Sequence, residues 1–163
     1  MSATRLRVEV DRFRLHAPFV ISNFTWHHAE VCTVHLERDG CVGRGEGVPI
    51  AYRPEGARDI ARQVEGLRAE LEGGLDRKAL DERLPAGPAR CAVDAALWEL
   101  EAGLGLGPVH ERAGLPAPRT IETAITVVFG SPDEMARQAS RFADCPLLKV
   151  KLGGSRDAEA IRA

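Results

Sequence analysis

The sequence lacks the cysteine spacings of a disulfide scaffold or a zinc site. Its four cysteines, Cys32, Cys41, Cys91 and Cys145, stand far apart, and no two form a CxxC pair. Isolated thiols of this kind are typical of a reducing compartment. The N-terminal residues also lack the apolar stretch of a secretory signal peptide. We therefore expect a reduced, cytoplasmic protein.

The sequence also lacks a long hydrophobic run and a dominant charge. Charged residues or glycines interrupt each apolar segment well before the roughly 20 residues that a membrane-spanning helix requires. The 22 basic and 24 acidic side chains give a formal net charge of -2, so the overall balance provides no cationic field for nucleic acid or an anionic membrane. We expect neither of these to be a partner.

What is present is an ordinary globular composition, with 44% hydrophobic and 28% charged residues. Residues 5–15 alternate apolar and polar side chains, as a strand with one buried face does. Residues 30–37 are rich in β-formers, and Asp39-Gly40 supplies a tight turn before residues 41–45 return. Residues 17–28 show no clean period and are expected to form a loop. The first part of the chain therefore predicts a three-stranded antiparallel meander.

The middle of the chain predicts helices. Apolar residues recur at helical spacing from Ile60 to Leu71 and end at a glycine pair. Residues 89–102 form the strongest helical segment, which Gly103 ends. Because Ala92, Ala95 and Ala96 are small, we expect another helix to approach this one closely.

After the linker at residues 115–118 the pattern changes to strand, helix, strand, helix. The expected elements are a strand over 121–129, a helix from a capped Ser131 to about Ala143, a strand over 147–152 and a helix from Asp157. This order is typical of parallel βα units. A (β/α)8 barrel needs on the order of 250 residues, so we expect an amino-terminal fragment with domains 1–118 and 119–163.

The second of these strands carries two lysines, Lys149 and Lys151. Residues two apart on a strand point to the same face, with Cα atoms roughly 7 Å apart. In a poorly solvated site, repulsion between two ammonium groups favours the neutral form of one of them, as a general base at physiological pH requires. The alternative is that alternating lysines mark a solvated face or protect an edge strand.

No metal site is expected from the other polar residues. Glu46 and Asp94 lie in segments where a charged side chain usually serves local hydrogen bonds or ion pairs. The pair His27-His28 with Glu30 has no further ligands at a convincing spacing, and we interpret it as part of the loop.

Several separated motifs resemble those of the enolase superfamily, of the mandelate racemase and muconate lactonizing enzyme type. They are GEGVP at residues 45–49, ARCAVDAALWEL at 89–100, GPVHE at 107–111 and LKVKLG at 148–153. Shorter matches resemble the dipeptide epimerases of the L-Ala-D/L-Glu epimerase type: PFxIS at 18–22, ETxxTV at 122–127 and SPxEM at 131–135.

This resemblance implies an α+β capping domain followed by the first βα units of a TIM-like barrel. It also implies Mg²⁺ as cofactor, a dipeptide as substrate, and a homo-oligomer in the full-length protein. Lys151 would abstract the proton next to the substrate carboxylate, giving an enediolate. Lys149 would be the neighbour that adjusts the proton affinity of Lys151. The family's metal ligands and second catalytic lysine belong to later barrel strands, so this chain alone is expected to be inactive and without a metal site.

The resemblance also assigns residues that contact or select the substrate. They are Thr126 on a barrel strand and the capping residues Phe19, Phe24, Trp26, Ile50 and Tyr52. We expect the aromatic pair Phe24 and Trp26 to favour a dipeptide with a hydrophobic or cationic side chain over Ala-Glu. The alternative is that both rings pack between loop and barrel and touch no substrate.

Two other functions stay open. One is a relative with the same scaffold and lysine pair, such as a muconate cycloisomerase or an o-succinylbenzoate synthase. The other is a capping-type domain that binds a small molecule or a partner subunit without catalysis.

Overall fold

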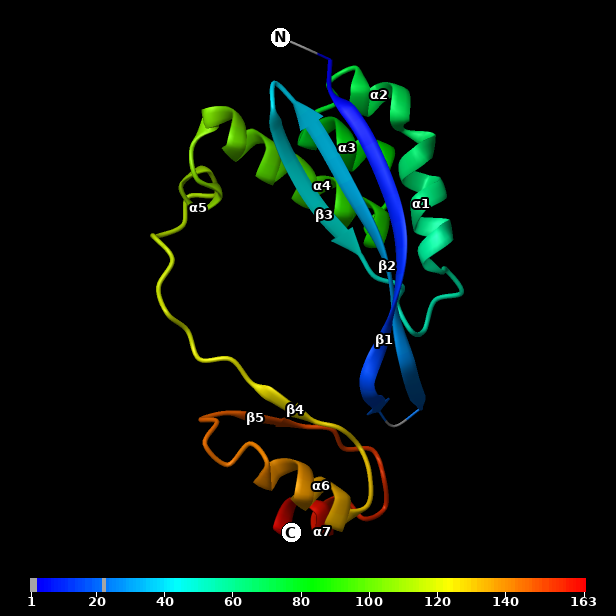
Figure 1. Ribbon diagram of the computed structural model, residues 1–163, viewed down its shortest axis with the longest axis vertical. Helices are drawn as coiled ribbons and strands as arrows, with labels where there is room; N and C mark the ends of the chain where they lie inside the picture. The colour runs from blue at the N-terminus through cyan, green and yellow to red at the C-terminus, as the bar shows by residue number, and fades with distance from the viewer. Residues whose placement is uncertain (1–2, 22) are drawn as a thin grey trace. The chain divides into compact units, whose positions relative to one another are not determined.

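The computed structural model of the chain describes residues 3–21 and 23–163. These residues form two compact units (Figure 1). The first unit contains the described residues up to Phe13 together with Glu30–Pro118, and the second contains Arg14–Ala29 together with Arg119–Ala163. Residues 14–29, which the sequence grouped with the capping part, therefore belong to the same unit as the residues after Pro118. None of the described helices is long and apolar enough to cross a membrane.

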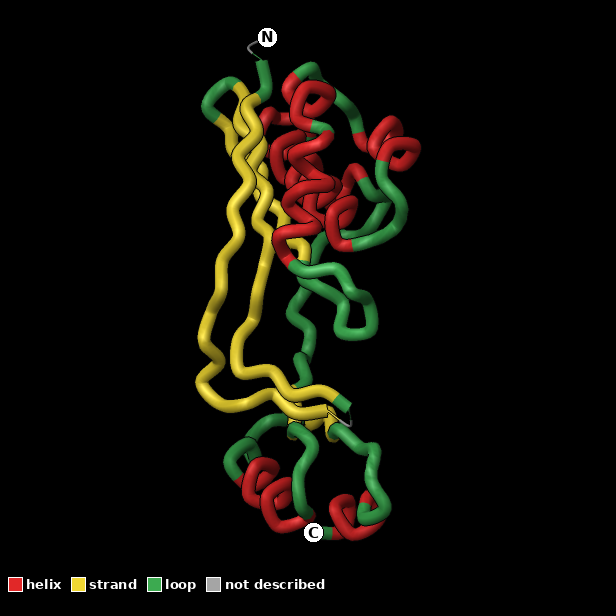
Figure 2. The backbone as a smooth tube through the Cα atoms, turned by 90° about the vertical axis from the view of Figure 1, so that its right-hand side faces the viewer, coloured by secondary structure: helices red, strands yellow, loops and turns green. Residues whose placement is uncertain are grey.

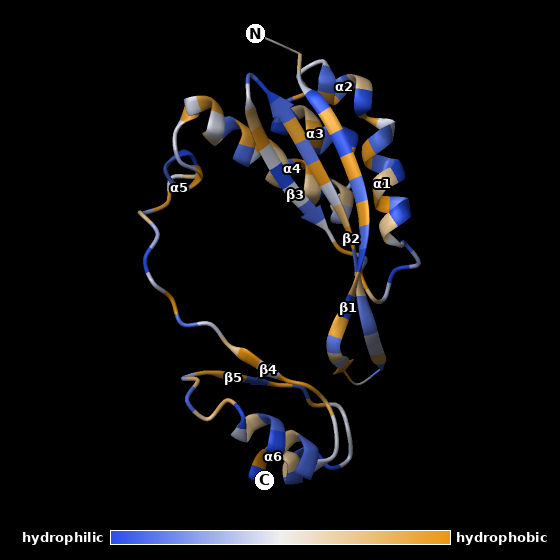
Figure 3. Ribbon diagram, viewed as in Figure 1, coloured by the Kyte–Doolittle hydropathy of each residue, from blue (hydrophilic) through white to orange (hydrophobic). Residues whose placement is uncertain are grey.

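The predicted antiparallel meander is confirmed. Its strands are β1 (Arg5–Ile21), β2 (Phe24–Arg38) and β3 (Cys41–Gly47), in the order β1-β2-β3. Polar and apolar residues alternate along these strands (Figure 3). Asp39 and Gly40 form the turn between β2 and β3 with φ of 49° and 80°, the left-handed geometry that favours Asp-Gly in tight hairpins.

The loop predicted over residues 17–28 is wrong for residues 17–21 and 24–28, which are strand, while residue 22 lies outside the described residues. β1 continues to Ile21 and β2 begins at Phe24, so the first two strands extend as a long hairpin. Aromatic and β-branched residues at this end favour extended backbone even though their order shows no clean period. Pro18 lies on an edge strand, the position in a sheet where proline is tolerated.

The helices of the first unit cover one face of its sheet (Figure 2). They are α1 (Ala57–Gly66), α2 (Arg68–Glu72), α3 (Arg77–Arg83), α4 (Pro88–Glu101), the short irregular segment η1 (Ala102–Leu106) and α5 (Val109–Arg112). The helix predicted over 60–71 is interrupted at Leu67, where φ is -101° and ψ is 7°. The sequence analysis did not predict α3.

Helix α4 contacts the helices α1 and α3, and its closest contact, at its small residues, is with strand β3. Gly43, Gly45 and Gly47 share the inner face of β3, and a Cβ atom built on Gly45 would lie 1.9 Å from the carbonyl oxygen of Ala92. The backbones of strand and helix therefore meet where both residues are small. Ala95, one of the three alanines expected at this contact, is exposed.

The second unit confirms the predicted parallel βα order. Its elements after Pro118 are β4 (Ile125–Val127), α6 (Pro132–Ser140), β5 (Leu148–Val150) and α7 (Asp157–Arg162), and β4 pairs with β5 in parallel. The strands are shorter than predicted, and Ile121 is 79% exposed. Among the described residues the sheet has two strands, so the flanking apolar residues have no further strand to pair with.

Helix α6 begins at the predicted cap and ends at Ser140, three residues earlier than expected. The Ser131 N–H donates to a Glu134 carboxylate oxygen at 2.9 Å, and the Glu134 N–H donates back to the Ser131 hydroxyl at 3.4 Å. The hydrogen bond from the Ser131 side chain lowers the pKa of Glu134. This capping box fixes the start of the helix that follows β4.

Candidate active site

The two lysines lie on and just after β5. Lys149 is exposed and stands opposite Thr126 in the register of the parallel pair. Lys151 follows the last residue of β5 and is half-buried. Its N–H donates to the carbonyl oxygen of Val127 at 3.0 Å, so the backbone remains paired with β4 at this point. Thr126, Lys149 and Lys151 are therefore held by the same two-stranded sheet.

The carboxyl ends of β4 and β5 both lead into ordered loops. After β5, the N–H groups of Gly153 and Gly154 donate to the Asp157 carboxylate, each at 3.0 Å. A Cβ atom on Gly154 would lie 3.0 Å from the ring of Phe129 in the loop after β4, so the two loops pack closely. Active sites of (β/α)8 barrels form from such loops, and Lys151 stands at the start of one of them.

The aromatic residues predicted to select the substrate form one cluster near the tip of the β1–β2 hairpin. The rings of Phe24 and Trp26 stack at 5.5 Å, and those of Phe19 and Trp26 meet at 6.1 Å with a tilt of 53°. The Phe129 N–H donates to the carbonyl oxygen of Val20 at 3.1 Å. The hairpin is thus tied to the loop that follows β4, within the same unit as the lysines.

The remaining two predicted residues belong to the first unit. Ile50 is half-buried, and its carbonyl oxygen accepts the Arg53 N–H at 2.9 Å in the turn after β3. The side chain of Tyr52 is 80% exposed.

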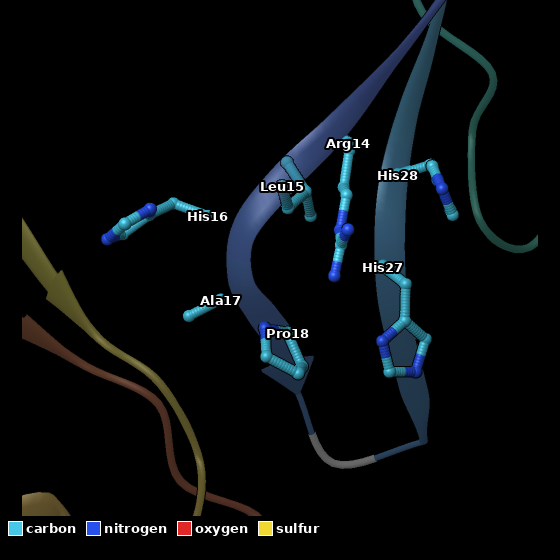
Figure 4. Close-up of a pocket in the computed structure, with 7 residues that line it drawn as sticks. All are labelled: Arg14, Leu15, His16, Ala17, Pro18, His27 and His28. Atoms are coloured by element: carbon cyan, nitrogen blue, oxygen red, sulfur yellow. The ribbon is translucent and has the colours of Figure 1, made fainter.

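His27 and His28 lie on strand β2 and not in the loop that the sequence analysis assigned them to. With Arg14, His16 and three apolar neighbours they line a cavity of about 430 Å³ (Figure 4). The sequence analysis considered this His pair for metal binding alone, and missed that basic residues of the preceding strand lie beside it. A signal was available in the basic residues Arg14 and His16, two positions apart, which precede the pair along the hairpin.

The described residues contain no group of three or more His, Cys, Asp or Glu side chains that could hold a metal ion. Glu46 is exposed on β3 and Asp94 is half-buried on α4. The donor set of this part of the protein therefore does not fit a magnesium site, which takes several oxygen ligands.

These features define a class of protein: an antiparallel α+β capping domain followed by parallel βα units, with paired lysines at the end of the second barrel strand. The chain belongs to the mandelate racemase / muconate lactonizing enzyme family, whose N-terminal domain matches residues 3–114. The resemblance drawn from the sequence motifs is confirmed.

The most informative relatives are epimerases. The chain is 40% identical over 149 residues to L-Ala-D/L-Glu epimerase of Escherichia coli (strain K12), covering 90% of this chain and 46% of that protein. It is 34% identical to an enolase family member of Agrobacterium tumefaciens with homology to dipeptide epimerases, solved with bound sodium and L-Ala-L-Glu. That structure superposes with a TM-score of 0.91 over 98% of this chain and 49% of the other.

A dipeptide epimerase of Methylococcus capsulatus, solved with Mg and the dipeptide L-Arg-D-Lys, shows the same fold. It is 27% identical, with a TM-score of 0.84, over 99% of this chain and 49% of that one. The chain thus spans about half the length of the relatives described here.

Proposed function

We propose that this chain is the capping and general-base part of a dipeptide epimerase, which inverts the α-carbon next to a carboxylate. The single observation that carries the proposal is the position of Lys151, half-buried at the carboxyl end of β5 beside a second lysine. The names of the relatives, epimerases acting on dipeptides, agree with it.

The choice of residue type supports a chemical role for this lysine pair. The chain has 19 arginines and three lysines, and two of those lysines are Lys149 and Lys151. A solvated face or a protected strand edge could use arginine, which this protein uses nearly everywhere else. A proton acceptor could not, because the guanidinium group keeps its proton at any physiological pH, whereas an amine can lose it.

In the proposed reaction, Lys151 acts as a base on one face of the substrate. Its neutral Nζ takes the proton from the α-carbon, the C–H bond breaks, and the electron pair moves into the adjacent carboxylate to give an enediolate. A second acid, a lysine across the barrel by family resemblance, returns a proton to the opposite face. By family resemblance, Lys149 is the neighbouring lysine that assists Lys151, and Thr126 contacts the substrate beside it.

Relatives of this chain are solved with Mg, and we propose that the full-length protein uses Mg²⁺. The described residues offer no suitable donor set, so a magnesium ion bound by this part alone is not included in the proposal. We propose accordingly that the 163-residue chain by itself does not turn over dipeptides. Deuterium incorporation at the substrate α-carbon, measured with the 163-residue chain, tests this directly. Turnover that EDTA abolishes would contradict the proposal.

The proposal is tested by deuterium incorporation in the full-length protein. In D₂O, with each substrate epimer in turn, Lys151→Ala is expected to abolish α-proton exchange from one epimer. Lys149→Ala is expected to retain exchange with a shifted pH optimum, because it removes a neighbouring charge and not the base. Lys78→Ala, which removes the exposed lysine of α3, is the matched control and should behave as wild type. Exchange of both epimers at the wild-type rate by Lys151→Ala would contradict the assignment.

A further inference from the structure

The ionisable side chains that line the cavity on the β1–β2 hairpin are all basic. Its lining consists of Arg14, His16, His27 and His28 with the apolar residues Leu15, Ala17 and Pro18, and it includes no acidic side chain. Arg14 extends into the space between the two strands, the ring of His27 lies over β2 beside it, and His16 and His28 extend to either side (Figure 4). A guanidinium and an imidazole therefore line one cavity together with apolar side chains.

Arg14 has no acidic partner among the described residues. The neighbouring Arg12 pairs with Glu30 at 3.4 Å, so the acid next to this part of β2 is already engaged. No ion pair or side-chain hydrogen bond joins Arg14 or His27 to any other residue in the described part of the chain. The donors of Arg14 and His27 are thus available to a ligand.

The chemistry of these donors indicates an anion. Arginine presents a planar fork of N–H groups that matches carboxylate and phosphate oxygens, and such charge-assisted hydrogen bonds are among the stronger ones in proteins. The three histidines do not make a metal site, since no group of metal-ligating side chains is found in the described residues. The volume of about 430 Å³ lies within the range of roughly 300 to 1,000 Å³ typical of small-molecule sites.

We propose that this cavity is a binding site for a small oxyanion, held chiefly by Arg14 and His27. The recognised group is a phosphate or a carboxylate, and Leu15 and Pro18 provide an apolar wall beside it. The site is separate from the aromatic cluster, because none of Phe19, Phe24 and Trp26 lines the cavity. It is also independent of the proposed epimerase reaction, because neither Lys149 nor Lys151 lines it.

The test is a titration of the 163-residue chain with inorganic phosphate and, separately, with succinate, at constant ionic strength, followed by ¹H–¹⁵N NMR. We expect saturable shifts confined to the amides of residues 14–18 and 27–28. Whichever anion binds more tightly identifies the source of the oxyanion. Arg14→Gln should weaken binding about tenfold, the effect of losing a hydrogen bond to a charged group. His27→Gln should weaken it by a smaller factor.

Arg58→Gln is the matched control, because it removes the same charge from an exposed position on α1. It should leave the affinity for both anions unchanged, and thermal unfolding should show that all three variants remain folded. The proposal is overturned if neither anion gives saturable shifts, if Arg58→Gln weakens binding as much as Arg14→Gln does, or if Zn²⁺ binds through His27 while both anions do not.

Discussion

Cys32 lies on β2 with none of its surface exposed. Burial, assisted by the negative charge of Glu65, raises the pKa of its thiol to about 11. The thiolate, and not the thiol, is the nucleophile that attacks alkylating reagents. A buried thiol with this pKa should therefore be inert at neutral pH. Cys91 in contrast is exposed on α4.

We predict that Cys91 reacts with iodoacetamide at pH 8 and that Cys32 reacts after unfolding only. The same pKa shift of Cys32 makes the free energy of unfolding depend on pH. Because the pKa of this thiol is higher in the folded than in the unfolded chain, its contribution to stability is intact below about pH 9 and is lost as pH rises toward 11. The total loss is roughly 2 to 3 kcal/mol. Peptide mapping measures the labelling, and urea unfolding from pH 8 to 11 measures the stability. Cys32→Ala should flatten the dependence of stability on pH, whereas Cys91→Ser should not. The same pH dependence in both variants would refute the assignment to Cys32.

Trp26 is the residue on which the choice of substrate depends in our proposal. In the full-length protein we predict that kcat/KM for Ala-Phe, Ala-Leu or Ala-Lys exceeds that for Ala-Glu by roughly tenfold, since an indole offers apolar area and a face for cations. Trp26→Arg should shift the preference toward Ala-Glu through a charge-assisted pair. Trp26→Phe is the control and should preserve the wild-type order. A dipeptide library decides the question, and a clear preference of the wild type for Ala-Glu would count against this role.

At the scale of elements, the closest backbone approach in the first unit is between β3 and α4. Alternate glycines on the strand face residues Pro88, Ala92 and Ala96 of the helix at its i, i+4 spacing. Because backbone lies on both sides of this contact, an added methyl group has no flexible side chain to displace.

We predict that Gly45→Ala destabilises the first unit by about 3 kcal/mol, the upper end of the usual overpacking cost. Gly66→Ala is the matched control: a Cβ atom there meets nothing within 4 Å, and alanine in a helix should be neutral or slightly stabilising. Urea unfolding can be followed by Trp98 fluorescence in a Trp26→Phe background, which reports on the first unit alone. A Gly45→Ala variant as stable as Gly66→Ala would show that the helix can move away freely.

At the scale of the whole molecule, the two units differ in how completely they bury their strands. In the first, β2 is paired on both sides and its core residues Val34 and Leu36 are fully buried. In the second, β4 and β5 pair only with each other among the described residues. Unpaired strand edges exchange their amides readily and promote association.

For the 163-residue chain we predict that the amides of β4 and β5 exchange with D₂O about a hundredfold faster than those of β2. Size-exclusion chromatography should show concentration-dependent association. In the full-length protein, further strands would cover these edges, and the same amides should become protected. Uniform protection in a monomer of the 163-residue chain would contradict this view.

The sequence by itself determined the meander, the Asp39-Gly40 turn, the capped start of α6 and the parallel βα order, because each depends on local propensity and short-range hydrogen bonds. It also carried the family motifs and the lysine pair. It could not determine where the strands end, since pairing partners far along the chain decide this: β1 continues to Ile21 and β2 begins at Phe24, whereas β4 is only three residues long.

Only the tertiary structure decided which surfaces meet. Alanines on α4 are compatible with a helix or a glycine-faced strand as partner, and the choice depends on the distant residues of β3. The break at Leu67 and the basic cavity of Arg14 and His27 arise in the same way, from packing and strand pairing between segments that no local pattern connects. Local patterns specify elements, whereas long-range burial and backbone pairing specify how they are joined.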